Sequence, residues 1–206
     1  MSINFKNLTI SDFTDIFSSN DIKPKQEINI NNIVKTIYED AGLDCGPWIA
    51  GGMGRNIALG ETNYNDIDVW FKNAYQLEQT QKRLQDLFGW EMFETFSSDN
   101  ALTYKIGKYT VQLIKRNYYK DINDIFANFD FTCCQIAVDK DLKIYGPGIQ
   151  DAVNYKLKLN KLDHKGFLAR YAKYIGYGYT MNLDDFVKII ETEELNYEFD
   201  GATLGY

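Results

Sequence analysis

The sequence is poor in the residues that build disulfide and zinc scaffolds. Only three of its 206 residues are cysteine and only one is histidine. Cys45, Cys133 and Cys134 are odd in number and lack metal-ligand spacing, and the adjacent pair is poorly placed for a mutual disulfide. We therefore expect a protein of a reducing cytoplasm rather than a disulfide-stapled secreted domain.

Long apolar runs and an excess of positive charge are also missing. No stretch is apolar for long enough to span a bilayer, and the N-terminus lacks the pattern of a secretory signal. The 22 Lys and Arg residues are outnumbered by 29 Asp and Glu residues, which gives a net charge of −7 and argues against a protein that coats nucleic acid. We expect a cytoplasmic protein without a membrane partner. Because Asn, Ile, Lys and Tyr are abundant, as in AT-rich genomes, that location becomes the host cytoplasm or a virion if the gene is phage-encoded.

The informative part of the sequence is residues 48–71, WIAGGMGRNIALGETNYNDIDVWF. Residues 48–50 form an apolar run that predicts a buried strand, which ends at Gly51 and Gly52. A short helix is expected over residues 53–59. The two glycines let backbone N–H groups approach an anion, and the N-terminus of the following helix adds positive dipole.

A second strand, expected over residues 66–71, carries a pair of carboxylates. Because strand side chains alternate, Asp66, Asp68 and Trp70 share one face and apolar side chains share the other. Two carboxylates side by side repel each other, and a divalent cation removes the repulsion. Mg²⁺ (or Mn²⁺) prefers a few carboxylates together with substrate phosphates. Asp66 and Asp68 are therefore the candidate metal ligands and catalytic residues.

Helices and a hairpin are expected elsewhere. Apolar spacing predicts helices over residues 29–41, 74–88, 163–177 and 183–192, with Leu87 and Ile175 on buried faces and Asp163 as an N-cap. Two strands, residues 101–106 and 109–115, flank a turn at Gly107-Lys108 and predict a hairpin.

A run of basic residues follows the expected strands. Such a run is usually a solvated face, but if it borders the acidic pair it is the best candidate for a nucleic-acid or triphosphate contact. Its members are Lys156, Lys158, Lys161, Lys165, Arg170 and Lys173.

Residues 51–68 resemble the head-domain signature of class II tRNA nucleotidyltransferases (CCA-adding enzymes) and bacterial poly(A) polymerases, in the DNA polymerase beta-like superfamily. That signature reads Gly-Gly, any residue, a small residue, Arg, Asp, aliphatic residues, Gly, a short polar turn and Asp-x-Asp. The matching residues are Gly51, Gly52, Gly54, Arg55, Gly60, Asp66 and Asp68, with Asn56 in place of the usual Asp.

Later segments resemble the same family in the same order. Residues 130–139 resemble its second signature, an Asp-Phe-Thr followed by a strand, residues 142–151 its closing strand and glycine turn, and residues 170–177 the start of its neck. Two positions depart from the pattern. Gln112 stands where a third acidic residue is often found, and Asn128-Phe129 replaces two arginines that would help to hold the nucleotide.

The resemblance implies an α+β (α/β) fold, namely a nucleotidyltransferase head domain with a mixed, antiparallel-rich sheet flanked by helices, followed by a short helical neck-like segment. We accordingly divide the chain into an N-terminal extension (1–28), the head domain (29–155) and the neck-like segment with an acidic end (156–206). The resemblance also implies a set of nucleotide-binding residues: Gly51, Gly52, Arg55, Asp130 and Arg170.

The implied activity is metal-dependent, template-independent transfer of a nucleoside monophosphate from an NTP to an acceptor hydroxyl, taken to be an RNA 3′ end. Gln112 and Asn128-Phe129 leave an alternative open: an inactive fold that serves as a structural or nucleotide-binding protein, such as a phage particle component with a protein partner. The enzyme is favoured because an inactive descendant has no reason to keep two costly carboxylates on one strand face. A Rossmann dehydrogenase is disfavoured because the glycines lack its three-glycine spacing.

Overall fold

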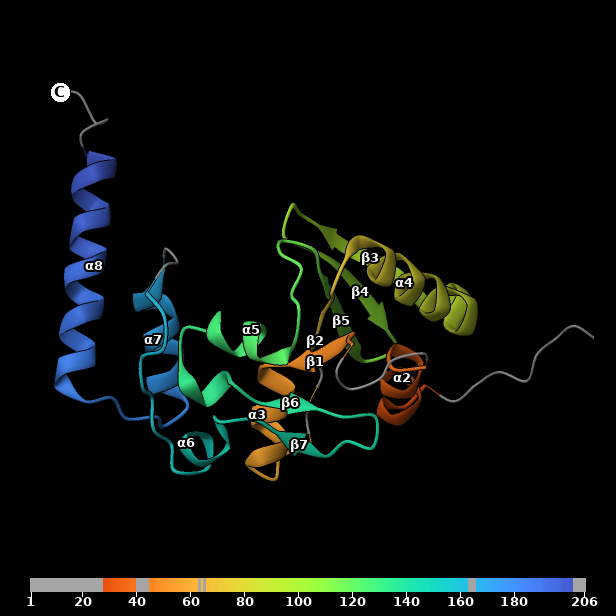
Figure 1. The fold of residues 1–206 in the computed structure, drawn as a ribbon, viewed down its shortest axis with the longest axis horizontal. Coiled ribbons are helices and arrows are strands. Elements are labelled where there is room, and N and C mark those ends of the chain that lie inside the picture. Colours follow the sequence, from red (N-terminus) through yellow and green to blue (C-terminus); the bar gives the residue numbers. More distant parts are fainter. Residues whose placement is uncertain (1–27, 40–44, 63, 65, 163–165, 202–206) are drawn as a thin grey trace, which may run out of the picture.

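The computed structural model describes residues 28–39, 45–62, 64, 66–162 and 166–201 (Figure 1). A seven-stranded sheet has the order β3-β4-β5-β2-β1-β6-β7. The strands are β1 Trp48–Ala50, β2 Asp66–Trp70, β3 Met92–Ser97, β4 Ala101–Ile106, β5 Tyr109–Ile114, β6 Ala137–Val138 and β7 Ile144–Tyr145. The helices are α2 Ile30–Ile37, α3 Gly52–Ala58, α4 Ala74–Phe88, α5 Ile122–Ala127, α6 Ile149–Val153, α7 Phe167–Gly176 and α8 Leu183–Gly201, and the 3-10 turns are η2 Gly89–Glu91 and η3 Thr132–Cys134.

The sheet is mixed and mostly antiparallel. β2 and β5 pair in parallel, whereas the other neighbouring strands pair antiparallel. In Figure 1, α2 and α4 lie together on one side of the β2–β5 region. This arrangement confirms the predicted α+β class, with an antiparallel-rich sheet flanked by helices.

The core under α2 and α4 determines which way β2 faces. Ile67 and Val69 are fully buried there, together with Leu84 of α4 and Ile33 of α2. Burying an aliphatic side chain of this size contributes about 1.5–3 kcal/mol, and a register slip of one residue would lose it. The apolar side chains of β2 therefore hold its acidic side chains on the opposite, open face.

A second cluster joins the two C-terminal helices to the end of the sheet. Phe167 of α7 and Ile189 of α8 are fully buried beside Phe131, next to η3. The ring of Tyr174, also in α7, lies edge-on to Phe131 with centroids 5.3 Å apart. This packing brings the first C-terminal helix against the glycine turn that precedes α3.

Several element boundaries were predicted closely. The helix Ala74–Phe88 and the strand Ala101–Ile106 have their predicted bounds. No helix among the described residues is both long and apolar enough to cross a membrane. The N-terminal extension, residues 1–28, lies outside the described residues except for its last member.

Two side chains that were predicted to be buried are exposed. Leu87 is 37% exposed, because the buried stripe of α4 runs through Thr80, Leu84 and Phe88 and Leu87 lies at its margin. Ile175 is 40% exposed, since Tyr174 and not its neighbour faces the second cluster.

One strand was not predicted, and two local predictions of secondary structure were wrong. No strand was predicted over β3, whose pattern of one buried residue followed by exposed ones is that of an edge strand. The strand expected within residues 130–139 is reduced to β6, because the N–H groups of Cys134 and Gln135 bond the carbonyls of residues three before them and form η3. α7 begins after Gly166, later than the helix start expected at Asp163, which lies outside the described residues.

Candidate nucleotide and metal site

The acidic pair lies on the open face of β2, next to β5. Asp66 is exposed and Asp68 is half-buried. In the parallel pairing of these strands, Asp66 lies beside Thr110 and Asp68 lies beside Gln112. The structure therefore places Gln112 next to the acidic pair, at the position where the resembled family often has a third carboxylate.

Asp68 has the most strongly perturbed carboxyl group of the site. Burial and the neighbouring charge of Asp66 raise its pKa from 3.8 to about 6, and the ammonium of Lys173 opposes the shift. Two carboxylates beside an amide carbonyl form an all-oxygen donor set, which suits Mg²⁺ or Mn²⁺. In the described part of the chain no group of three or more His, Cys, Asp and Glu side chains is placed to hold a metal ion, so the candidate site has two charged ligands.

The glycine turn lies directly against Asp68. Gly51 has φ of 110°, a conformation that disfavours side chains, and a Cβ there would lie 3.7 Å from Asp68 Oδ2. The N–H of Gly51 is committed, because it donates to the carbonyl of Ile136 at 2.9 Å. A Cβ at Gly52 would meet nothing within 4 Å. Gly52, at the start of α3, is therefore the part of the turn that an anion can approach.

These elements enclose a cleft of about 490 Å³. It brings together all the predicted site residues: Gly51, Gly52, Arg55, Asp66, Asp68, Asp130 and Arg170. Residues that the sequence did not assign to the nucleotide site also line it, among them Phe129, Cys134, Tyr174 and Tyr177.

Arg55 is anchored by α7. Its Nη1 donates to the hydroxyl of Tyr174 at 3.1 Å, and its guanidinium lies over the rings of Tyr174 and Tyr177 at 5.3 and 5.4 Å. Nη2 donates to Oδ1 of Asn56 at 3.0 Å. Asn56, which replaces the usual Asp of the signature, thus orients the guanidinium without neutralising it. Arg55 keeps its full positive charge for a ligand in the cleft.

Arg170 and Asp130 form an ion pair across the cleft wall. The carbonyl of Asp130 accepts from the backbone N–H of Asn160 at 2.7 Å, which fixes the loop that carries the carboxylate. The pair holds α7 against the segment that resembles the second signature. Arg170 therefore lines the cleft, but Asp130 partly neutralises its positive charge.

Phe129, at a position where the resemblance implies an arginine, contributes an aromatic ring to the cleft. Its ring lies edge-on to Trp70 with centroids 5.6 Å apart, and it would contact a Cβ at Gly51 at 3.4 Å. The cleft lining at this point is aromatic, so its positive charge comes from other lining residues, Arg55, Arg170 and Lys173.

The basic run divides between structural and cleft positions. Lys158 pairs with Asp151 at 2.7 Å, and Lys161 donates to Oδ1 of Asn128 at 2.7 Å. Lys173, like Arg170, lines the cleft. These two residues border the acidic pair, which is the condition under which the basic run was expected to contact a nucleic acid or a triphosphate.

Cys134 also lines the cleft and was not predicted to do so. Its thiol lies 2.7 Å from the hydroxyl of Tyr174 at the cleft floor. Burial raises the pKa of the Tyr174 phenol well above its usual range, so Tyr174 acts as a neutral hydrogen-bonding group. No sequence pattern around the adjacent cysteines indicated this contact.

The fold is similar to that of solved CCA-adding enzymes. The Thermotoga maritima CCA-adding enzyme complexed with tRNA matches with a TM-score of 0.61 and 13% identity, over 84% of this chain and 44% of that one. The Bacillus stearothermophilus CCA-adding enzyme in complex with CTP matches with a TM-score of 0.54 and 15% identity, over 75% of this chain and 40% of that one. A tRNA-processing enzyme in an apo form gives 0.56 and 16%, over 83% and 49%.

This chain thus spans less than half the length of those enzymes, and the likeness shows a shared nucleotidyltransferase head-domain fold. A family model described as Gabija anti-defense 2 family protein matches residues 24–149, more than half of the chain. No curated protein matches this chain.

Proposed function

Since this chain belongs to the Gabija anti-defense 2 family and has a nucleotidyltransferase-type fold, we propose that it transfers a nucleoside monophosphate from an NTP to an acceptor hydroxyl. We further propose that this transfer counters Gabija defence, the action that the family's description names. The acceptor is RNA or another nucleotide-bearing molecule.

One observation carries the proposal: the acidic pair of β2 and several cationic side chains line a single cleft. Asp66 and Asp68 line it together with Arg55 and Lys173. Carboxylates alone would repel a triphosphate, and cations alone would bind any anion. Together in one cleft, they suit a triphosphate that arrives with a divalent cation.

The chain's own residues would bind and orient the donor. The start of α3 would receive a phosphate at the backbone of Gly52, which is half-buried and has open space where a Cβ would lie. Arg55, held by Tyr174, would contribute positive charge at a fixed place and so lose little side-chain entropy on binding.

Asp66 and Asp68, with the amide carbonyl of Gln112 beside them, would hold Mg²⁺ or Mn²⁺. When bound, the ion would supply the positive charge that neutralises phosphate oxygens and lowers the pKa of an attacking hydroxyl. The raised pKa of Asp68 fits this role, because burial and the charge of Asp66 outweigh the opposing charge of Lys173 at that carboxylate.

The deciding experiment is incorporation of each α-labelled ribonucleotide into a mixed RNA pool and into tRNA that lacks its 3′ end, with Mg²⁺ and then Mn²⁺. The blank is the double variant Asp66→Ala/Asp68→Ala. The matched control is Asp86→Ala/Asp141→Ala, at exposed positions that do not line the cleft. Label transfer that persists in the control and disappears in the blank supports the proposal. Equal transfer by the blank would contradict it.

The link to defence has its own test. A phage restricted by Gabija is plated on cells that express Gabija together with this protein. We expect the wild type and the Asp86→Ala/Asp141→Ala control to restore plating and the Asp66→Ala/Asp68→Ala variant to fail. Full restoration by the acidic-pair variant would separate the anti-defence action from nucleotidyl transfer.

A second candidate function is nucleotide binding without turnover. One observation favours it: the neutral Gln112 lies beside Asp68, where a third carboxylate would complete the metal site. Under this reading the wild type binds NTP in an Asp66- and Asp68-dependent way but transfers no label to any acceptor. The incorporation assay and an NTP-binding assay on the same variants distinguish the two functions.

A further inference from the structure

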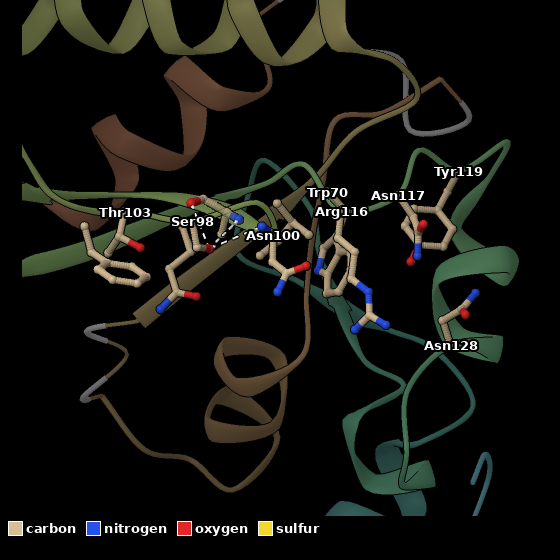
Figure 2. Close-up of a pocket in the computed structure, with 12 residues that line it drawn as sticks. Trp70, Ser98, Asn100, Thr103, Arg116, Asn117, Tyr119 and Asn128 are labelled. Carbon is tan, nitrogen blue, oxygen red and sulfur yellow. Dashed lines mark hydrogen bonds between the residues drawn. The ribbon is translucent and has the colours of Figure 1, made fainter. Parts of the chain in front are cut away.

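A second cavity lies beside Trp70 of β2 (Figure 2). Residues of β4 and β5 line it, on one side of β2, whereas the glycine turn follows β1 on the other side. The volume of the cavity is about 380 Å³, within the range of small-molecule sites. Gln112 lines both cavities, and its strand neighbour is Asp68. The second cavity therefore begins where the nucleotide cleft ends, with the acidic pair beside the boundary.

An aromatic wall with fixed orientation bounds this cavity. Trp70 follows Asp68 on the same face of β2, and its indole N–H donates to the carbonyl of Ala50 at 3.2 Å. The rings of Tyr119 and Phe129 lie edge-on to the indole, with centroids 5.7 and 5.6 Å away. Trp70 is only half-buried, so part of a rigid aromatic surface remains accessible.

The polar side chains of the cavity are mostly neutral and mostly uncommitted. Figure 2 shows Asn100, Arg116 and Asn117 around the aromatic wall. In the described part of the chain, the side chains of these three residues form no hydrogen bond or ion pair. Asn128 differs, because its amide already bonds the carbonyl of Asp124 and the ammonium of Lys161. Arg116 is exposed and is the one cation that lines the cavity.

The two cavities thus differ in chemistry. The cleft with Arg55, Arg170 and Lys173 suits a polyanion, whereas the second cavity offers a ring surface, amide groups and a single guanidinium. Such a set matches a nucleoside, because every base has a π-face to stack and edge atoms that bond amides. A single guanidinium is enough to bind one backbone phosphate of the nucleic acid that carries this nucleoside.

The in-line geometry of phosphoryl transfer also assigns the two substrates to separate cavities. In phosphoryl transfer the attacking and leaving oxygens lie roughly in line through the α-phosphorus. If the triphosphate lies over α3, the attacking oxygen must come from the side of the acidic pair that lies away from the glycine turn. The second cavity opens on that side, past Gln112.

We infer that this second cavity binds the terminal nucleoside of the acceptor, with its base beside Trp70 and its ribose hydroxyl directed toward Asp68. The inference rests on the proposed function and identifies the acceptor class as a single-stranded nucleic acid end. In the transfer, the ribose oxygen bonds the α-phosphorus, the bond from that phosphorus to the β-phosphate oxygen breaks, pyrophosphate leaves, and the hydroxyl proton passes to solvent.

The test fills the cavity without touching the acidic pair. Ala101 is half-buried and lines the cavity, so Ala101→Leu adds a side chain to the space that the nucleoside would occupy. The matched control is Ala74→Leu, at an exposed position on α4, which packs against the other face of the sheet. Asn117→Ala is a second cavity variant, at an exposed loop position where the fold does not depend on the side chain.

Two measurements are made on each protein: binding of a fluorescently labelled trinucleotide RNA, and binding of the NTP that the wild type incorporates, both with Mg²⁺. We expect Ala101→Leu and Asn117→Ala to weaken trinucleotide affinity at least tenfold and threefold, respectively. NTP affinity should stay within twofold, and Ala74→Leu should match the wild type in both assays. In the transfer assay, KM for the acceptor should rise while KM for the NTP does not.

Failure of this inference and failure of the proposed function have different signatures. Trinucleotide binding that is undetectable, or equal in the wild type and both cavity variants, alongside normal NTP binding overturns the acceptor site and leaves nucleotidyl transfer intact. Transfer to a protein hydroxyl but not to RNA also overturns it. A wild type that binds neither NTP nor trinucleotide contradicts the proposed function and the acceptor site together.

Discussion

Asp68 is the residue at which folding and the proposed chemistry oppose each other. Its carboxyl is half-buried beside Asp66, and both circumstances disfavour its charged form. The fold tolerates this cost because Ile67 and Val69, on either side of it, are fully buried and hold the strand in register.

The first prediction concerns the stability of the metal-free protein. Burial and the charge of Asp66 raise the pKa of Asp68 from its ordinary value of 3.8 to about 6 in the folded state, so between those pH values the folded state binds more protons than the unfolded state. The free energy of unfolding of the wild type should therefore fall as pH rises through this window. Asp68→Asn should remove that fall and stabilise the protein at pH 7.5 by about 1–3 kcal/mol.

Urea denaturation in EDTA at pH 3.5 and pH 7.5 measures this effect. Asp86→Asn, at an exposed position on α4, is the matched control for the loss of one carboxylate. The stabilisation by Asp68→Asn should vanish at the lower pH. A variant that is less stable than the wild type at pH 7.5 would show that the carboxylate has a favourable partner in the folded state.

The second prediction concerns Gln112. Because Gln112 lies beside Asp68 on the neighbouring strand, Gln112→Glu should add a third carboxylate to the candidate metal site. We expect Mg²⁺ affinity to rise about tenfold, which is about 1.4 kcal/mol, and the transfer rate to rise with it at limiting Mg²⁺. Isothermal titration calorimetry with Mg²⁺ in the presence of NTP measures the affinity. Gln135→Glu would not serve as a control, because Gln135 is buried.

A better control for Gln112→Glu is Gln85→Glu, which places the same change at an exposed position on α4. It should leave Mg²⁺ affinity unchanged. If Gln112→Glu weakens Mg²⁺ binding, the amide carbonyl rather than a charge is what the site requires, and the assignment of a third-ligand position would be wrong.

At the scale of elements, α3 links the glycine turn to the second signature segment. Gly54 lies inside this helix, and a Cβ there would come within 2.7 Å of the carbonyl oxygen of Ile136. The helix must approach that backbone closely, because Gly51 N–H also bonds the carbonyl of Ile136. Both contacts place the first turn of α3 in the cleft.

The third prediction compares two glycines of α3. Gly54→Ala should destabilise the fold by about 1–3 kcal/mol, because the steric clash with backbone exceeds the helix propensity of about 1 kcal/mol that Ala gains. Gly52→Ala should leave stability unchanged or slightly raised, since its Cβ meets open space. That Cβ would instead extend toward a bound phosphate and reduce NTP affinity at least tenfold.

Thermal unfolding and NTP titration of the two variants measure these outcomes. The expected result is a separation of effects: Gly54→Ala mainly unfolds, and Gly52→Ala mainly loses ligand. NTP binding by Gly52→Ala at wild-type strength would show that the phosphates do not approach the start of α3.

At the scale of the whole molecule, the net charge is unfavourable for the anionic ligand that we propose. The net charge is −7, so the protein as a whole repels a polyanion and binding depends on a few local cations. Of the described members of the basic run, only Arg170 and Lys173 line the cleft, and Arg170 is paired with Asp130. Lys165 lies outside the described residues. Lys173 is exposed and carries much of the remaining attraction.

The fourth prediction follows from this distribution. Lys173→Gln should weaken NTP binding about tenfold and raise the pKa of Asp68, whose ionised form Lys173 favours. Lys156→Gln, an exposed member of the same basic run that does not line the cleft, should change neither. NTP titrations at two salt concentrations measure the contribution, which should shrink as salt screens it. Equal loss in both variants would assign the attraction to the protein's general charge.

Periodicity and turn chemistry in the sequence specified the central elements. The alternation in residues 66–71 predicted that Asp66 and Asp68 share one face, because burial of alternate aliphatic residues is a local property of a strand. The helix Ala74–Phe88 and the strands flanking Gly107 were equally local and were predicted closely. The class II relationship and the division into segments at residues 28 and 155 stay predictions.

Tertiary structure alone decided what faces the acidic pair. Arg55 and Tyr174 are 119 positions apart in the chain and bond each other, and no local pattern encodes such a contact. The same holds for Phe129 against Trp70, which turns the place of a missing arginine into an aromatic wall. The sequence thus determined which residues can do chemistry, because side-chain type and strand alternation are local. Packing of α7 and of residues 128–135 against the sheet determined which of them share a cleft, because that depends on burial between distant segments.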